Sequence, residues 1–539
     1  MQQCEFFPER GNYLKAIPDT LPALLAQRVN GVAPALIARG RRLSYGELAG
    51  ESRRVAQGLR RLGVQAGDCV ALWLPNVPAW LAAFFACAQL GAIAVSVNTR
   101  FRSHELADIL RRSRSRVLVF WPRFKGIDFA AILGACDPQA LEHLQTLVAY
   151  DEEGLDAPTT VVGKATLSYA SLASGAPLPE SRAAPDAGCA IFTTSGTTRA
   201  PKFVLHDQRT VIRHAFDVVK GFSIDAEATT LLAPPLCGVF GFCNAMASLA
   251  AGRPMVMAPG WDAEQAARDI VMHRVTHING TDEAAAQLLD IDALSFSNIR
   301  LFGYAAFNPA QADIVRRADA RGLKLVGLYG ASEIQALFAH QDAKAPVAER
   351  MLAGGRPVSA QAHVRVRDPE SGALLAHGAS GELEFFAPSS RMVGYRGDPD
   401  ATTAGFTADG YYRSGDLGTA SADGRFVFLT RMGDALRLGG FLVSPAEIEA
   451  VVQEAPGIAA CQVVGVPRTE GLLAVAFVIL QQGAALDEAA VIAHVASRLA
   501  RYKVPRRVLP IDAFPVTPGA NATKIQKGKL REMAEALLH

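Results

Sequence analysis

Short apolar runs alternate with helix-like segments up to about residue 330 of this chain, and this alternation limits the folds open to it most. The runs read CVALWLP from Cys69, SRVLVFW, TLLAPPL, RPMVMAP, THINGT, IRLFGY and LKLVGLYG. A strand that is apolar along its whole length is buried on both faces, as strands are in parallel sheets covered by helices. The pattern therefore predicts an α/β fold with parallel sheets.

From residue 381 to 430 the runs become short, alternating and punctuated by Gly and Asp (GELEFF, GYYRSGDLG, GRFVFL), which is typical of antiparallel hairpins. Here we expect a small β-barrel-like part. After Arg431 a compact α+β unit follows, with a helix capped by Ser444, two strands, a helix from Asp487 and a Lys-rich tail. At 539 residues the chain exceeds one core, so we predict domains over residues 1–431 and 432–539.

Residues 78–95 (PAWLAAFFACAQLGAIAV) are apolar enough to raise the question of a membrane span. Gly91 reads as a helix stop, and a β-type run from Ile93 to Val97 follows it. We therefore expect a core helix that turns into a buried strand, and no transmembrane segment. The preceding amphipathic helix, LSYGELAGESRRVAQGLRRLGVQAGD, presents Leu48, Val55, Leu59 and Leu62 on one face.

Charge and cysteine content narrow the class of partner and the compartment. The net charge of +2 is spread without a long basic run, which argues against nucleic acid as the main partner. Eight cysteines are scattered without a C-x-x-C pair or metal-ligand spacing, and the N-terminal segment lacks the apolar core of a secretory signal. These features predict a cytoplasmic protein with reduced thiols, and they leave a homodimer open.

The segment FTTSGTTRAPKFVLHD, residues 192–207, carries the first chemical signal. An apolar β-run feeds a hydroxyl-rich turn with Gly196, which Pro201 and Lys202 close. Hydroxyl groups and free backbone N–H groups suit phosphate oxygens, and the lysine adds a positive charge. The G-x-x-x-x-G-K-[ST] pattern of the P-loop is absent. Taken alone, the segment is equally compatible with a Ser/Thr-rich surface loop.

Together with five further segments, this loop resembles the adenylate-forming (AMP-dependent synthetase/ligase) superfamily, and acyl-CoA synthetases in particular. The matching segments cover nearly the whole chain in the family's order. They are LPNVPAWLAAFFACAQLGAIAVSVNTRFRSHEL (74–106), YGASE (329–333), YRSGDLG (412–418), RMGDALRLGGFLVSPAEIE (431–449) and PVTPGANATKIQKGKLRE (515–532). The resemblance implies a large α/β N-terminal domain and a small, mobile C-terminal lid domain.

The resemblance also implies ATP, Mg²⁺ and coenzyme A as cofactors or substrates. It assigns Glu333 to the Mg²⁺ ion, Asp416 to the ribose hydroxyls and Arg431 to ribose or phosphate. A surface glutamate, a turn aspartate and an interface salt bridge are the structural alternatives. The residues placed at ATP or AMP are Thr194, Ser195, Gly196, Thr197, Thr198, Lys202, Gly303, Tyr304, Ala305, Tyr329, Gly330, Ala331, Ser332, Asp416 and Arg431, with Thr198 beside Glu333 at the metal.

The catalytic residue that the resemblance implies, with Glu333, is Lys524 in ATKIQKGKLR. A carboxylate that attacks the α-phosphate is itself an anion, so a cation between the two lowers their repulsion as the bond forms. Lys527 and Lys529 are neighbouring rivals, but only Lys524 precedes the isoleucine of the motif. A solvated Lys-rich tail is the structural alternative.

Two half-reactions follow from the resemblance. The acid displaces pyrophosphate from ATP to give an acyl-adenylate, and a thiol then attacks the carbonyl so that AMP leaves. The lid swings between the two steps, and Gly433 is the predicted hinge because glycine has the widest backbone freedom. Gly440 is predicted to lie beside the pantetheine of coenzyme A. Turns in a hairpin are the structural alternative for both glycines.

Three positions depart from the family pattern: Arg199 and Thr523 stand where glycine is usual, and Gly238 replaces a histidine or aromatic residue. The acyl pocket is predicted to contain small or apolar residues without lysine or arginine, which favours a nonpolar acid (alicyclic, aromatic or medium-chain) and a place in fatty acid metabolism. Its members are Gly238, Phe242, Gly303, Tyr304, Ala305 and Ala331. An adenylating enzyme that loads a separate carrier protein and an inactive nucleotide-binding homologue stay open as alternatives.

Overall fold

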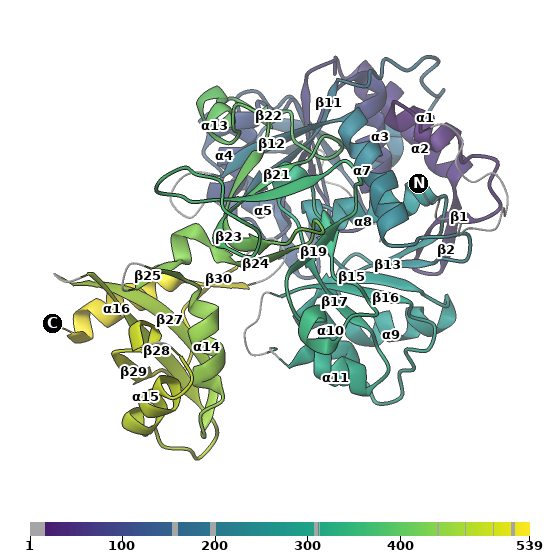
Figure 1. The fold of residues 1–539 in the computed structure, drawn as a ribbon. Coiled ribbons are helices and arrows are strands. Elements are labelled where there is room, and N and C mark those ends of the chain that lie inside the picture. Colours follow the sequence, from purple (N-terminus) through teal and green to yellow (C-terminus); the bar gives the residue numbers. More distant parts are fainter. Residues whose placement is uncertain are drawn as a thin grey trace.

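The computed structural model describes residues 17–152, 160–194, 201–306, 311, 313–438, 441–468, 471–499, 501–518 and 523–538. They form a large part built on two sheets and a smaller C-terminal part that stands beside it (Figure 1). This mixed α/β architecture confirms the predicted fold class.

The first sheet has nine strands in the order β22-β12-β11-β4-β3-β5-β8-β10-β9. Its central strands are parallel, and β12 and β22 extend it antiparallel at one edge. The strands are β3 (Cys69–Trp73), β4 (Ile93–Ser96), β5 (Val117–Phe120), β8 (Thr146–Ala149), β9 (Thr160–Val161), β10 (Lys164–Ser168), β11 (Gly188–Thr194), β12 (Lys202–Asp207) and β22 (Gly394–Tyr395).

The second sheet has thirteen strands in the order β2-β1-β14-β13-β15-β16-β17-β18-β19-β24-β23-β21-β20. Its parallel strands are β1 (Pro34–Ala38), β14 (Met255–Met257), β13 (Thr230–Leu232), β15 (His277–Thr281), β16 (Leu301–Ala305) and β17 (Leu325–Tyr329). The antiparallel strands are β2 (Arg41–Ser44), β18 (Ala339–His340), β19 (Gly354–Pro357), β24 (Phe426–Arg431), β23 (Tyr412–Ala420), β21 (Ser380–Phe386) and β20 (His363–Arg367).

The hairpins predicted from residues 381–430 are present, and within the described residues their strand order shows no closed barrel. Among the described residues, β18 and β19 join the hairpin strands to β17, so that they continue the parallel sheet and do not close on themselves. Both connecting strands are short, and neither shows an alternating pattern that would reveal the link.

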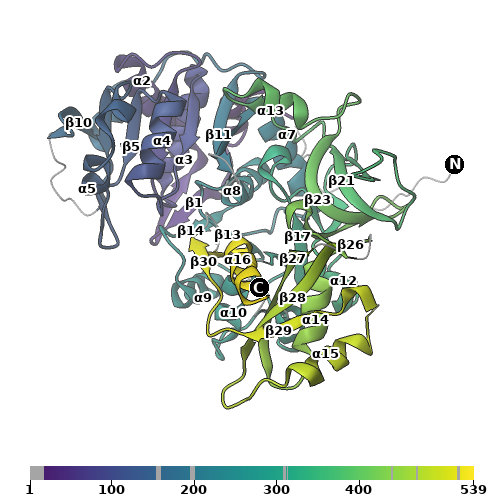
Figure 2. The ribbon, with the colours of Figure 1, turned by 90° about the vertical axis from the view of Figure 1, so that its left-hand side faces the viewer.

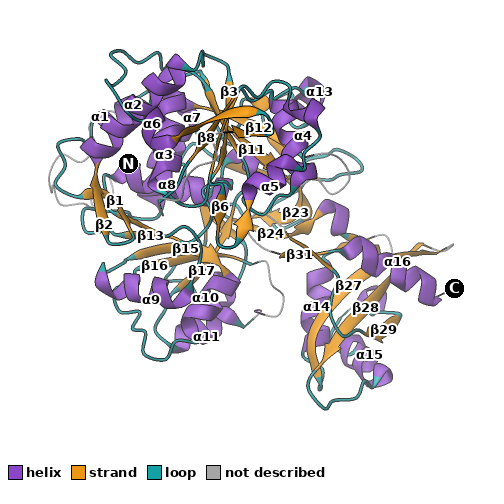
Figure 3. Ribbon diagram, turned by 180° about the vertical axis from the view of Figure 1, so that it is seen from behind, coloured by secondary structure: helices purple, strands orange, loops and turns teal. Residues whose placement is uncertain are grey.

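Helices separate and cover the two sheets, as Figure 3 shows from behind. Between the sheets lie α2 (Tyr45–Arg61), α3 (Pro78–Leu90), α7 (Gln208–Gly221) and α8 (Val239–Ala251), whose apolar side chains share one core with both sheets. The outer face of the thirteen-stranded sheet is covered by α9 (Ala263–Met272), α10 (Asp282–Leu289) and α11 (Ile314–Ala320). The outer face of the nine-stranded sheet is covered by α4 (Ser103–Ser113) and α5 (Phe129–Gly134).

The short elements of the large part complete this layering. They are α1 (Leu21–Ala26), α6 (Tyr169–Leu172), α12 (Val347–Arg350), α13 (Pro399–Ala404), and the hairpin of β6 (Arg123–Phe124) with β7 (Ile127–Asp128).

The apolar stretch at residues 78–95 folds as predicted. Helix α3 is buried from Ala79 to Leu90, and Gly91 ends it in the left-handed conformation, with φ of 71°, before β4 begins. The helix is apolar all round because other protein elements surround it on every side. Within the described residues, no helix has the length and apolar character needed to span a membrane.

The C-terminal part has cores of its own that draw only on residues after Asp434. Helices α14 (Pro445–Gln453), α15 (Glu488–Ala496) and α16 (Lys527–Leu538) pack on a sheet of β27 (Ile458–Arg468), β28 (Gly471–Leu480) and β29 (Arg507–Pro510). Two hairpins join them: β25 (Leu436–Leu438) with β26 (Phe441–Val443), and β30 (Val516–Pro518) with β31 (Thr523–Ile525). Figures 1 and 2 show β30 on the side turned towards the large part.

Candidate active site

The hydroxyl-rich loop lies in a hairpin of the nine-stranded sheet. Thr194, the last residue of β11, pairs directly with Lys202, the first residue of β12. The pairing brings the two ends of the predicted phosphate loop to the same point of the sheet. Four predicted phosphate ligands and one departure lie outside the described residues: Ser195, Gly196, Thr197, Thr198 and Arg199.

Glu333 lies next to this hairpin, in a short 3₁₀ turn (Ser332–Ile334) that follows β17. Its side chain is largely buried, and Oε1 accepts a hydrogen bond of 2.8 Å from the hydroxyl of Tyr395 on β22. The Nζ atom of Lys202 lies 4.4 Å from the centre of the same tyrosine ring. Tyr395 therefore connects the lysine of the phosphate hairpin with the predicted metal carboxylate.

Two buried histidines hold the backbone on either side of Glu333. His206 contacts the carbonyl oxygen of Ser332 at 2.7 Å, and His214 contacts that of Ala336 at 2.7 Å, each through Nε2. Burial lowers the pKa of His206 to about 4 and also lowers that of His214. Both rings are therefore neutral at neutral pH, and Nε2–H is the donor because a carbonyl oxygen can only accept.

The backbone after Glu333 is strained. Gln335 and Leu337 have φ of 63° and 62°, in the left-handed region that side chains with a Cβ rarely adopt. The side-chain amide of Gln335 donates to the carbonyl oxygens of Thr210 and Ser390, which holds this conformation. Strain of this kind persists where the surrounding contacts determine it, and it is concentrated at functional sites.

Asp416 forms the second carboxylate centre, on β23 beside the end of β17. Its Oδ2 accepts a 2.5 Å hydrogen bond from the hydroxyl of Tyr329, and Oδ1 lies 2.9 Å from Nη1 of Arg431, its partner residue on β24. The Arg431 contact is an ion pair without hydrogen-bond alignment, so Oδ1 has no donor among the described residues. The Asp416 side chain is 2% exposed and that of Arg431 is 58% exposed, so the arginine borders solvent.

Burial raises the pKa of Asp416 to about 6, while the charge of Arg431 and the hydroxyl of Tyr329 act in the opposite direction. The charge of Glu333 adds to the upward shift, so the two carboxylates lie close enough to interact electrostatically. Such displaced carboxyl groups are concentrated where proteins bind or transform ligands.

Strand β16 presents its predicted residues to opposite sides of the sheet. Tyr304 faces the outer helix layer, where its hydroxyl donates to the carbonyl oxygen of Met351 at 3.0 Å. Ala305 packs against the core between the two sheets. A Cβ atom at Gly303 would lie 2.3 Å from Oδ1 of Asn279, so only glycine fits there. The side chain of Tyr304 is thus separated from its two neighbours.

The other predicted pocket residues lie at the start of α8 and after β17. Gly238 is the N-cap of α8, and Phe242 is fully buried against the rings of Trp80, Phe84 and Phe192. Gly330 and Ala331 connect β17 to the turn that holds Glu333, and a Cβ atom at Gly330 would lie 2.6 Å from Cα of Ala336. Glycine is therefore required by the close approach of the two backbone segments.

The C-terminal residues predicted to act in the reaction are only partly described. Gly433 is exposed in the 3₁₀ turn (Met432–Asp434) after β24, with no atom within 4 Å of an added Cβ. Gly440 lies outside the described residues. The backbone of Lys524 lies on β31, paired with Thr517 in the β30–β31 hairpin that faces the large part.

The rival lysines occupy different environments. Lys527 forms an ion pair of 3.1 Å with Glu449, whose Oε1 also accepts a hydrogen bond from the backbone N–H of Val463. Lys529 is exposed on α16. Lys527 is therefore part of the packing of the C-terminal part, whereas Lys524 lies in the β30–β31 hairpin.

The carboxylate arrangement fits a magnesium ion that is shared with a substrate. No cluster of three or more His, Cys, Asp and Glu side chains able to hold a metal occurs in the described ranges. Mg²⁺ is commonly held by one or two carboxylates together with phosphate oxygens and waters. Glu333 keeps one carboxylate oxygen outside its hydrogen bond with Tyr395, so it can serve as such a ligand.

Three residues of this site were missed by the sequence analysis: Tyr395, His206 and His214. A lone histidine in a strand or helix gives no functional signal, and His206 falls inside the quoted loop segment without a metal-ligand spacing. The position of Tyr395 follows from the pairing of β22 with β12, two strands far apart in the chain. The Gly-Tyr pair before the Asp-Pro turn at residues 398–399 was the one local cue.

Comparisons with known proteins agree with this geometry. The family model for the AMP-binding enzyme matches residues 26–395, and that for the AMP-binding enzyme C-terminal domain matches residues 447–520. A 3-(7a-methyl-1,5-dioxo-octahydro-1H-inden-4-yl)propanoyl:CoA ligase of Mycobacterium tuberculosis is 31% identical over 97% of this chain and 99% of its own length. A feruloyl-CoA synthase of an Amycolatopsis species is 31% identical over 94% of this chain and 96% of its own length.

Among solved structures, ATP-bound MatB from Rhodopseudomonas palustris superposes with a TM-score of 0.81 at 26% identity, covering 96% of this chain and all of that one. The family match extends over well over half of the chain, and the relatives match it almost end to end. The resemblance drawn from the motifs is confirmed. This chain belongs to the AMP-binding enzyme family.

Proposed function

We propose that this enzyme activates a carboxylic acid with ATP and transfers the acyl group to the thiol of coenzyme A. In the first step a carboxylate oxygen attacks the α-phosphorus of ATP, the bond to the β-phosphate breaks and pyrophosphate leaves. In the second, the thiol sulfur attacks the acyl carbon, AMP leaves and the thiol proton is released. The relatives that match along the whole chain are named as CoA ligases, which supports this reaction.

The observation that carries the proposal is the buried carboxylate of Asp416, whose Oδ1 lies in an ion pair with Arg431 but accepts no aligned hydrogen bond among the described residues. A buried carboxylate with a raised pKa and one oxygen without a donor is a ready acceptor for a ribose hydroxyl. Tyr329 fixes the other oxygen, and Arg431 at the solvent border can contact phosphate. Both carboxylate centres lie beside the hairpin that is predicted to hold the phosphates.

The same site supports the first half-reaction. We expect Lys202 to balance the charge of the β- and γ-phosphates, and Tyr395 to orient Glu333. Glu333 and Thr198, which lies outside the described residues, are proposed to hold magnesium. When bound, the ion supplies positive charge that balances the phosphate oxygens. Lys524, carried by the β30–β31 hairpin, is proposed to move to the nucleotide. There it would lower the repulsion between the acid and the α-phosphate.

The second half-reaction is proposed to use another lid pose. Gly433 would absorb the change in backbone angles, and Gly440 would border the pantetheine. Gly238 provides no side chain that could act as a base, so thiol attack relies on the good leaving group, AMP.

The acid is proposed to be nonpolar apart from its carboxylate, of alicyclic, aromatic or medium-chain type. Gly303, Ala305 and the core helix α8 offer small or apolar surfaces. The relatives named for a bicyclic propanoate and for ferulate act on ring-bearing acids, which supports this class. Fatty acid metabolism is the broader context that we propose.

Three further features belong to the proposal. The domain boundary is set at residue 431, between β24 and the 3₁₀ turn of Gly433. The seven cysteines that the structure describes are all buried and free, which supports a cytoplasmic site of action. A homodimer is the proposed assembly, and the mass of the enzyme in solution tests it.

The direct test measures AMP release with ATP, Mg²⁺ and coenzyme A over a panel of carboxylic acids. Acid-dependent AMP release together with acyl-CoA formation is the expected result. AMP release that requires a carrier protein in place of coenzyme A would support a carrier-loading enzyme instead. No ATP–pyrophosphate exchange with any acid would contradict it in favour of an inactive homologue.

A further inference from the structure

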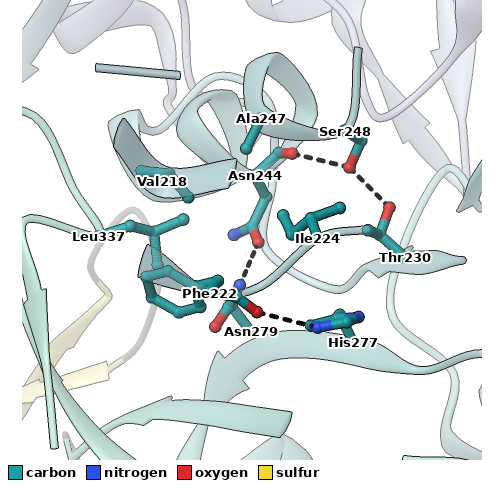
Figure 4. A pocket seen from close by; sticks show the side chains of 10 residues that line it. All are labelled: Val218, Phe222, Ile224, Thr230, Asn244, Ala247, Ser248, His277, Asn279 and Leu337. Carbon is teal, nitrogen blue, oxygen red and sulfur yellow. Dashed lines mark hydrogen bonds between the residues drawn. The ribbon is translucent and has the colours of Figure 1, made fainter. Parts of the chain in front are cut away.

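A small polar pocket lies between α7, α8 and the parallel part of the thirteen-stranded sheet (Figure 4). Its polar side chains come from two neighbouring strands and one helix that faces them, with apolar residues of α7 and Leu337 around them. They are Thr230 on β13, Asn244 and Ser248 on α8, and His277 and Asn279 on β15. An interior this polar between two apolar layers requires an explanation.

The pocket adjoins the candidate active site on two sides. Asn279 is the register partner of Gly303 on β16, and its Oδ1 lies directly over that glycine. Leu337 ends the strained segment that begins after Glu333. The alternation along β15 turns His277 and Asn279 towards α8, whereas Ile278 points into the outer helix layer.

A chain of hydrogen bonds fixes the orientation of the two asparagine amides. The Nδ2 group of Asn244 donates to the carbonyl oxygen of Phe240 at 3.0 Å, and a carbonyl can only accept. Oδ1 of Asn244 therefore faces Asn279 and accepts from its Nδ2 group at 2.7 Å. This leaves Oδ1 of Asn279 as an acceptor with no donor among the residues that the structure describes.

The other polar groups of the pocket have partners. The hydroxyl of Ser248 donates to the backbone oxygen of Asn244 at 3.0 Å and contacts the hydroxyl of Thr230 at 2.7 Å. Nε2 of His277 lies 3.0 Å from the carbonyl oxygen of Phe222 (Figure 4). Asn279 is 5% exposed, so water outside the protein cannot supply the missing donor. The pocket thus lacks one donor.

The charge of the pocket limits what can supply this donor. Burial lowers the pKa of His277 to about 4, so the ring is neutral at neutral pH. The lining residues include no lysine or arginine. An anionic group would meet an acceptor and no cation, whereas a neutral hydroxyl or N–H group would complete the hydrogen bonds.

We propose that Oδ1 of Asn279 accepts a hydrogen bond from a hydroxyl or N–H group on the acyl part of the acid, with Asn244 as its positioning residue. The enzyme then prefers acids with such a neutral donor to matched acids without it. This inference rests on the proposed function and modifies its substrate class, from an acid that is nonpolar apart from its carboxylate to a mainly apolar acid with one neutral donor. A buried water molecule is the competing occupant.

The test measures acid-dependent ATP–pyrophosphate exchange by the full-length enzyme with three matched forms of each acid. Phenylpropanoates and cyclohexanecarboxylates carry a hydroxyl group, a hydrogen or a methoxy group at the same position. For at least one position, the hydroxyl form exceeds both others by roughly tenfold or more in kcat/KM, because a buried acceptor is left unpaired without it. The methoxy form is decisive, since it retains the oxygen but cannot donate.

Two variants locate the effect. Asn279→Leu removes the acceptor, and it is expected to bring the hydroxyl-to-hydrogen ratio of kcat/KM close to one. Ile278→Val, on the same strand but in the opposite layer, is the matched control and keeps the ratio of the wild type.

The outcomes separate this inference from the proposed function. Exchange with several acids but no preference for any hydroxyl form overturns the inference, assigns the pocket to water and leaves the proposed function intact. A preference that persists in Asn279→Leu also overturns it. If Asn279→Leu does not fold, the comparison of hydroxyl and methoxy forms in the wild type tests the inference. Equal kcat/KM values for the two forms at every position overturn it. Absence of exchange with every acid overturns the proposed function itself.

Discussion

Asp416 is kept in surroundings that oppose its charge. Its pKa lies at about 6 against a usual value of 3.8, so between these pH values the folded protein binds a proton that the unfolded chain has lost. The contribution of this group to folding stability therefore falls as the pH rises through that window. A carboxylate retained at a cost in stability, with one oxygen free for a donor, is what a ribose site requires.

Asp416→Asn is expected to separate stability from function. Above about pH 7 the free energy of unfolding should stay equal or increase, by about 1–3 kcal/mol, because the buried charge is gone. The KM for ATP should rise roughly tenfold or more, since the ribose hydroxyls lose a charged acceptor. In the wild type, kcat/KM for ATP should fall as the pH drops through about 6, as Asp416 takes up its proton.

Urea unfolding and initial-rate kinetics across this pH range check both parts. An unchanged KM for ATP in Asp416→Asn would remove the residue from the nucleotide site.

Tyr395→Phe tests the connection between Glu333 and the phosphate hairpin. The variant retains the ring beside Lys202 but loses the hydroxyl that holds the carboxylate. Half-saturating Mg²⁺ should rise several-fold, and the fold should be retained at a cost of about 1 kcal/mol. Magnesium titration of pyrophosphate exchange measures the effect. Tyr411→Phe, whose ring packs under Arg365, is the control and should titrate as the wild type does.

Among single residues, the motifs pointed to charged side chains whose chemistry already suggests a nucleotide or metal ligand. Glu333, Asp416, Arg431 and Lys202 stand at defined places in quoted segments, and the structure brings them to one site. Asn279 could not be identified, because THINGT fits the strand pattern and matches no functional motif. Its function depends on the amide of Asn244, which only packing brings within reach.

Among the elements, the link between β24 and the C-terminal part is where the reaction is expected to depend on motion. Gly433 is exposed, lies outside the left-handed region and has free space around a Cβ atom, so nothing in this pose requires glycine. A requirement for glycine would therefore come from a second pose of the lid.

Gly433→Pro is predicted to slow acyl-CoA formation by about tenfold or more while pyrophosphate exchange is largely retained, because a fixed φ resists the second pose. Gly433→Ala should leave both half-reactions and the stability close to the wild type, since the added methyl group meets no atom. Separate assays of exchange and thioester formation check this. Equal loss of both half-reactions in Gly433→Pro would place the hinge elsewhere.

Periodicity predicted the elements well where each strand is buried between helices. All seven buried runs of the first 330 residues contain strands, and the helix with Leu48, Val55 and Leu59 on its apolar face begins and ends within its predicted segment. The link between the hairpin strands and β17 could not be predicted, because sheet continuity through β18 and β19 is a tertiary property of two short strands.

For the molecule as a whole, buried neutral histidines should make the fold sensitive to acid. Burial lowers the pKa of His206 and His277 to about 4 and also lowers that of His214. Below the ordinary value of 6.5 the unfolded chain takes up protons that the folded protein does not, so stability is lost as the pH falls towards 4. His206 and His277 each contribute up to about 3 kcal/mol to this loss, and His214 acts in the same direction.

Urea unfolding at about pH 7 and about pH 5 should show this decline, which exceeds the opposite contribution of Asp416 because three groups act against one. His277→Gln should reduce the slope. Stability that rises from neutral pH towards pH 5 would contradict the account of these three sites.

A lysine of the C-terminal part is proposed to let two anions meet at the nucleotide, and Lys524→Ala tests this role most directly. Acid-dependent ATP–pyrophosphate exchange should fall by roughly a hundredfold or more, whereas acyl-CoA formation from a presynthesised acyl-adenylate should be retained. Lys529→Ala, exposed on the following helix, is the matched control and should exchange at the rate of the wild type. Undiminished exchange in Lys524→Ala would contradict the account.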